Sequence, residues 1–134
     1  MIYLDSNVFL NAILDEEKGE IARELLRGVQ DGKDQAATSA LTFDEVFWVV
    51  KKHRGFEDAL KASKALLEMP NLIFIEVNDK VIWHAWELSK EYGLDPRDSI
   101  HAACALSRDI KTIVSEDEHF DKVKEVKRQG LGRG

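Results

Sequence analysis

The strongest constraint on the fold is the regular alternation of two kinds of segment along the chain. Short apolar runs such as NLIFIEV at 71–77 predict buried strands, and longer segments with apolar residues at helical spacing predict helices. The predicted strands cover residues 2–5, 35–40, 71–77 and 110–114. The predicted helices cover residues 6–14, 16–33 (ending at DGK), 41–53, 56–69, 79–93 and 95–109. The predicted order is βααβααβααβ, and the amino-acid sequence contains no internal repeat.

This alternation predicts a parallel sheet with helices on both faces, a three-layer α/β/α sandwich with a central parallel sheet. The length of 134 residues fits one domain, which we place at 1–125. Residues 126–134 are basic, and we expect them to form a short helix that frays into a disordered tail. In folds of this class the ligand crevice opens beyond the carboxyl ends of the strands.

Composition excludes several classes of protein. The net charge of -6 argues against nucleic-acid binding through a basic face, and no window approaches the ~20 apolar residues of a membrane-spanning helix. Strand-like residues begin at Ile2 and leave no room for a signal peptide, so we expect a cytoplasmic protein. The single cysteine, Cys104, excludes an internal disulfide and a cysteine-rich zinc site.

Four acidic residues from distant segments are expected at the crevice. Asp5 closes the first predicted strand and Asp117 follows the last, while Glu45 and Asp98 lie early in helices that return toward the same edge. Carboxylates that share a pocket repel each other unless cations intervene. Oxygen ligands select Mg²⁺ or Mn²⁺, and such a site favours attack of a metal-activated water on a phosphodiester.

Each acid also has a simpler interpretation. Asp5 could cap the following helix, Asp98 could complement the helix dipole after Pro96, and Asp117 could lie in a solvated turn. Glu45 could complete a capping box in TFDE, and the apolar neighbours of Asp44 are similar, so spacing leaves the choice between these two acids open. Only the four together point to a metal site.

Four sequence blocks, in order, resemble the PIN-domain ribonucleases of the VapC toxin type from bacteria and archaea. The blocks are IYLDSNVFL at 2–10, TFDEV at 42–46, PRDSIHAA at 96–103 and IVSEDEHFDKV at 113–123. The resemblance spans residues 1–125 and implies the three-layer PIN fold. It also places the catalytic, metal-binding tetrad of the family at Asp5, Glu45, Asp98 and Asp117, and so selects Glu45 over Asp44.

The resemblance implies further site residues and partners. Asn7 and Ser115 occupy positions that help to hold the metal or its waters, and Asp121 matches an acid that binds a second metal through water. The cofactor would be Mg²⁺ or Mn²⁺ and the substrate RNA, with a small antitoxin as a partner and a homodimer as the assembly. The chain departs from the family pattern at His101, where an apolar residue is more usual, and we expect this histidine to be packed and hydrogen-bonded.

Two further features bear on substrate binding. Glu116 and Glu118 add negative charge beside the predicted site, which would disfavour an anionic substrate. The candidate phosphate contacts are Lys51, Lys52, His53, Arg54, Arg97 and the basic tail. KKHR at 51–54 is, however, more typical of a solvated helix C-terminus.

Two other functions compete with the ribonuclease. A non-catalytic interaction module of the same fold would bind an antitoxin-like peptide or itself, and Trp48, Trp83 and Trp86 would suit it if they are exposed. They could equally belong to the core. A phosphoacceptor receiver domain also carries acids at strand ends, but YLDSN has one acid after the first strand and TIVSE lacks the lysine such a domain needs.

Overall fold

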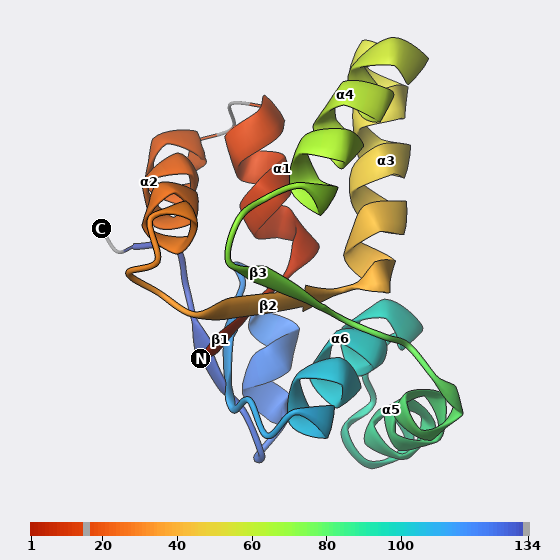
Figure 1. Ribbon diagram of the computed structural model, residues 1–134. Helices are drawn as coiled ribbons and strands as arrows, with labels where there is room; N and C mark the ends of the chain where they lie inside the picture. The colour runs from red at the N-terminus through yellow and green to blue at the C-terminus, as the bar shows by residue number, and fades with distance from the viewer. Residues whose placement is uncertain (15–16, 133–134) are drawn as a thin grey trace.

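Five short strands form one central, all-parallel sheet between two layers of helices (Figure 1). The computed structural model describes residues 1–14 and 17–132. The strands are β1 (Ile2–Leu4), β2 (Ala36–Ser39), β3 (Leu72–Ile75), β4 (Thr112–Val114) and β5 (Lys127–Gln129). The helices are α1 (Ser6–Leu14), α2 (Gly19–Gln30), α3 (Ala40–Arg54), α4 (Phe56–Leu67), α5 (Asp79–Tyr92), α6 (Pro96–Ser107) and the 3₁₀ helix η1 (Glu118–Lys122). The predicted three-layer α/β/α sandwich is confirmed.

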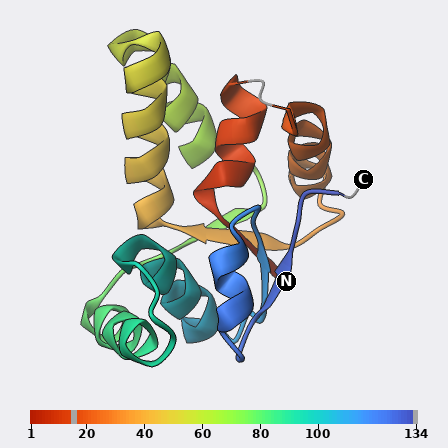
Figure 2. The same cartoon turned by 180° about the vertical axis from the view of Figure 1, so that it is seen from behind.

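The two faces of the sheet carry separate hydrophobic cores. Helices α1 to α4 cover one face and pack on Leu4 and Val114, while α5 and α6 cover the other and pack on Tyr3 and Ile113 (Figures 1 and 2). This division follows from the pleat, because successive side chains of a strand point to opposite faces. Tyr3 therefore points toward α6, which becomes important at the site.

The strand order β3-β2-β1-β4-β5 reverses direction at β1. The chain adds β2 and β3 on one side of β1 and then crosses to place β4 on the other side, with Tyr3 paired to Ala37 and to Ile113. A reversal of this kind opens a crevice beyond the carboxyl ends of the two strands that flank it. Asp5 follows β1 and Ser115 follows β4, so both lie at this point.

The expected frayed helix at the C-terminus is wrong over Lys127–Gln129. These residues form β5, which pairs with β4 in parallel register. Leu131 is 2% exposed and packs in the core under α1 to α4, and its backbone N–H donates to a Glu116 carboxylate oxygen at 2.6 Å. Burial of this side chain and a charge-assisted hydrogen bond hold the segment in place.

The other predicted elements form within a few residues of their expected limits. Helix α2 begins at Gly19, and the expected start of this helix at residue 16 lies outside the described residues. None of the helices in the described parts of the chain is long and apolar enough to cross a membrane.

Candidate metal and active site

Asp5 forms the buried centre of the site. Its side chain follows β1, and the residue is only 5% exposed. The Ser6 N–H donates to Oδ1 at 2.7 Å, while Ser115 Oγ and Asn7 Nδ2 donate to Oδ2 at 2.6 and 3.0 Å. Burial raises the pKa of Asp5 above its ordinary value, against the opposing effects of His101 and the Ser115 hydrogen bond. Asn7 and Ser115 thus support this carboxylate, in agreement with their predicted positions.

Glu45 reaches the same place from α3. Its Oε1 lies 2.7 Å from His101 Nε2, and its Oε2 lies 3.9 Å from Arg97 Nε. Burial would raise the pKa of Glu45, but the hydrogen bond and charge of His101 outweigh it and the pKa is lowered. Helix α3 begins at Ala40, so Glu45 lies beyond the first turn and does not complete a capping box. The neighbouring Asp44 is exposed, so the structure brings Glu45 and not Asp44 to the site.

Asp98 and Asp117 form a second acidic pair, together with His119. Asp98 lies in the first turn of α6, and Asp117 caps η1, its Oδ1 accepting from the His119 N–H at 2.9 Å. The Asp117 N–H donates to Ser115 Oγ at 2.9 Å, and Ser115 Oγ in turn donates to Asp5. Ser115 therefore connects this loop to Asp5. Burial, followed by the charges of Asp117 and Asp5, raises the pKa of Asp98 to about 7.

The structure places the four predicted acids in two groups, each with one histidine. Within each group, one potential ligand atom per residue lies within 4.8 Å of the others: Asp5, Glu45 and His101 form the first group, and Asp98, Asp117 and His119 form the second. The charge of Asp5 also contributes to the raised pKa of Asp98, so the two groups are close enough to interact electrostatically. The raised pKa of Asp98 indicates that the protein does not fully neutralise the negative charge of the neighbouring carboxylates. Carboxylate oxygens in such surroundings fit a hard divalent cation.

The other predicted acids lie at the edge of the site. Asp121 accepts two hydrogen bonds from the Arg128 guanidinium, at 3.0 and 3.3 Å. Glu116 faces Lys18 Nζ at 3.5 Å in addition to binding the Leu131 N–H, so part of its charge is neutralised. Glu118 is exposed.

Sequence reasoning missed the role of His119. Its Nδ1 lies 2.8 Å from Asp117 Oδ1 and 3.7 Å from Asp98 Oδ2, and its side chain remains largely exposed. The sequence offers one signal for this contact, because His119 follows Asp117 by two residues. At this spacing the backbone often folds back onto the side chain of a capping aspartate. His101 is buried and hydrogen-bonded, as expected, but its contacts with two acids of the tetrad were not foreseen.

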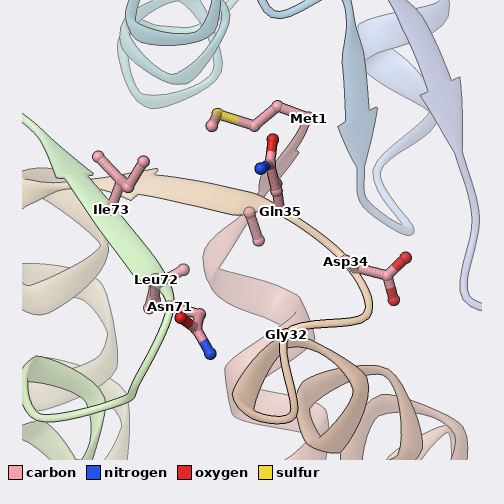
Figure 3. Close-up of a pocket in the computed structure, with 8 residues that line it drawn as sticks. Met1, Gly32, Asp34, Gln35, Asn71, Leu72 and Ile73 are labelled. Carbon is pink, nitrogen blue, oxygen red and sulfur yellow. The ribbon is translucent and has the colours of Figure 1, made fainter.

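A separate hollow at the opposite end of the sheet does not belong to this site. It has a volume of about 320 Å³ and is lined by residues that precede or begin β1, β2 and β3, including Met1, Asp34 and Asn71 (Figure 3). Among the described residues that line it, Asp34 is the single charged side chain. The chemistry of the molecule is concentrated at the carboxyl ends of the strands.

Comparison with known proteins agrees with this fold. A sequence profile of the PIN domain matches residues 2–126. This chain belongs to the PIN-domain family. A comparison with curated protein sequences found no match.

Solved structures of similar fold come from toxin-antitoxin systems. This PIN-domain protein superposes on a chain of VapBC2 from Rickettsia felis bound to a promoter DNA fragment, with a TM-score of 0.77 and 20% identity over 98% of this chain and 100% of that chain. VapC20 from Mycobacterium tuberculosis, a toxin that cleaves the sarcin-ricin loop, gives a TM-score of 0.77 and 16% identity over 92% and 95% of the two chains. DNA-bound VapBC from Salmonella typhimurium gives 0.76 and 18%, with 98% of both chains covered.

Proposed function

We propose that this protein is a Mg²⁺- or Mn²⁺-dependent endoribonuclease that hydrolyses RNA phosphodiester bonds. The observation that supports it best is the pair of clusters of potential ligand atoms, Asp5 and Glu45 with His101, and Asp98 and Asp117 with His119. In this proposal Asp5 and Asp98 hold the principal metal, and Glu45 and Asp117 complete the site directly or through water. Asp121 is a further candidate for contact through water.

The residues of the chain have distinct tasks in this proposal. When bound, the metal supplies an activated water and stabilises charge on the phosphate oxygens. Ser115 and Asn7 hold the Asp5 carboxylate in a fixed orientation through its Oδ2. Arg97 and His119, both largely exposed beside the acids, are positioned to contact the phosphates of an incoming RNA strand.

We further propose that the protein is the toxin of a toxin-antitoxin pair. The solved structures with this fold include VapBC toxin-antitoxin complexes and a toxin that cleaves an RNA loop. A nuclease that attacks cellular RNA needs an inhibitor in the same compartment. The partner in this proposal is a small antitoxin protein, and the compartment is the cytoplasm.

The test is cleavage of a broad panel of RNAs by purified protein with Mn²⁺. We expect the parent to cleave RNA and chelation to stop cleavage. Asp5→Asn should lower the cleavage rate by at least about 100-fold, because removing a metal ligand reduces activity more than removing a residue that only orients a ligand. Asp44→Asn is the matched control, since it removes an equal charge one residue from Glu45 but outside the site. A metal-loaded parent that cleaves none of the RNAs would refute the nuclease.

A non-catalytic interaction module is the second candidate, and one surface feature favours it. The side chains of Trp48, Trp83 and Trp86 are 56%, 69% and 56% exposed. Trp48 also borders a hollow of about 300 Å³ whose other lining residues include Phe43 and Phe47. Capture of an antitoxin-like peptide by a protein that cuts no RNA would support this function over the nuclease.

A further inference from the structure

His101 lies inside the acidic site with both ring nitrogens already engaged. Its Nδ1 lies 2.6 Å from Tyr3 Oη, and its Nε2 lies 2.7 Å from Glu45 Oε1 and 3.3 Å from Asp5 Oδ1. The Tyr3 hydroxyl lies 2.8 Å from Ser39 Oγ. A continuous chain of polar groups thus runs from the end of β2, through β1 and α6, to two acids of the tetrad.

Packing alone does not explain this chain. Tyr3 and Ser39 are fully buried, His101 is 1% exposed, and the next residues along α6 that share its core, Ala102 and Ala103, are small and apolar. Burying polar groups costs free energy unless each is hydrogen-bonded, and an apolar residue at this place on α6 would avoid that cost. The polar chain is therefore better explained by what it does to the acids than by the core.

The proton positions follow from the chemistry of the partners. The Tyr3 hydroxyl donates its single proton to Ser39 Oγ, so its oxygen accepts the hydrogen bond from His101 Nδ1. An ionised carboxylate only accepts hydrogen bonds, so Nε2 must carry the proton that points to Glu45. A protonated Nε2 has no lone pair for a metal, and Tyr3 prevents the ring from turning Nδ1 toward the acids.

We propose that His101 is a positioning residue whose Nε2–H, held in place by Tyr3, orients the Glu45 and Asp5 carboxylates for binding a divalent cation. This inference rests on the proposed metal-dependent function. It assigns a task to a buried polar residue that packing alone does not explain. In this inference His101 is not a metal ligand, although a metal-binding histidine would also lie among the acids.

The test measures Mn²⁺ affinity by electron paramagnetic resonance, without RNA, for the parent and three variants. His101→Leu should weaken binding by about 10 to 100-fold, the usual effect of losing a group that orients metal ligands. His101→Gln keeps an amide N–H for Glu45 and should restore most of the affinity. Tyr3→Phe keeps every acid and His101 in place and should weaken binding several-fold. Circular dichroism and thermal unfolding establish that each variant is folded.

Several results would overturn the inference. Unchanged or tighter Mn²⁺ binding in His101→Leu and Tyr3→Phe would show that the imidazole does not position the acids. Strong ¹⁴N coupling in the pulsed spectrum that persists in His119→Ala but is lost in His101→Leu would make His101 a metal ligand instead. A parent that binds no Mn²⁺ would refute both this inference and the proposed function, whereas one that binds Mn²⁺ but cuts no RNA would refute only the nuclease.

Discussion

At the scale of single residues, the site is an incompletely neutralised group of acids. Two imidazoles lie among these acids, His101 between Asp5 and Glu45 and His119 beside Asp98 and Asp117. The remaining repulsion is largest at Asp98, whose pKa is raised to about 7 by burial and by the charges of its acidic neighbours. A divalent cation would relieve this repulsion, so metal binding and proton release are linked.

This linkage predicts the pH dependence of stability in metal-free protein. The folded state holds a proton on Asp98 up to about pH 7, whereas the unfolded chain releases it near its ordinary pKa of 3.8. The contribution of Asp98 is therefore fully present below pH 3.8 and is lost as the pH rises through 7. We expect the free energy of unfolding to lose roughly 1 to 2 kcal/mol, less than the full shift would give because Asp98 interacts with Asp117.

The measurement is urea unfolding between pH 5 and 8 with a chelator present. The Asp98→Asn variant should lack this component of the pH dependence, and adding Mn²⁺ to the parent should restore stability mainly at the higher pH values. If the free energies of unfolding of the parent and of Asp98→Asn changed with pH in the same way, the assignment of this effect to Asp98 would be contradicted.

The sequence predicted some site residues better than others for a physical reason. Asp5 and Asp117 follow predicted strands, and the carboxyl ends of parallel strands meet at one edge whatever the details of packing. The choice between Asp44 and Glu45 depends on which face of α3 meets α6, which local spacing does not contain. The contact of His101 with Tyr3 joins residues 98 positions apart, so it follows only from the assembled sheet.

At the scale of elements, helical periodicity predicted the helices and short apolar runs predicted the central strands, β2 only weakly, but no pattern predicted β5. Its sequence, KRQ, has no apolar alternation because β5 lies at the edge of the sheet, where charged side chains are favoured. What holds the segment is the burial of Leu131 just after the strand. A single leucine in RQGLGRG gives too weak a signal for a sequence pattern to detect.

Leu131→Ala should test whether this segment is integral to the fold. Removing a nearly buried leucine side chain should lower the free energy of unfolding by about 2 to 4 kcal/mol. Leu67→Ala makes the same chemical change at a residue of α4 that is 55% exposed, and it should cost much less. Urea denaturation of both variants gives the comparison, and equal small effects would mean that the segment frays as the sequence first indicated.

At the scale of the whole molecule, the acidic site and the exposed aromatic surfaces lie on different structural parts. The acids gather at the carboxyl ends of the strands, while Ile82, Trp83 and Trp86 form an apolar patch on the outer side of α5. The rings of Trp83 and Trp86 contact each other edge to face, with centroids 6.3 Å apart. Exposed patches with paired tryptophans are typical of protein-protein interfaces.

We expect the α5 patch to mediate the predicted homodimer. A double substitution, Trp83→Ser with Trp86→Ser, removes the two largest apolar side chains of the patch and should convert dimer to monomer in analytical ultracentrifugation. Trp48→Ser is the matched control, because it removes an equally exposed tryptophan from α3. A parent that is monomeric at high concentration, or a double variant that remains dimeric, would contradict this assignment.

The most direct test of the central claim is the anomalous scattering of crystals grown with Mn²⁺. Acids from the residue after β1, from α3, from α6 and from the loop after β4 are proposed to share one divalent cation. We expect a Mn²⁺ peak within bonding distance of the Asp5 and Asp98 carboxylates, with Glu45 and Asp117 bound directly or through water. A map without Mn²⁺ at these carboxylates, at a concentration that saturates other sites, would contradict the claim.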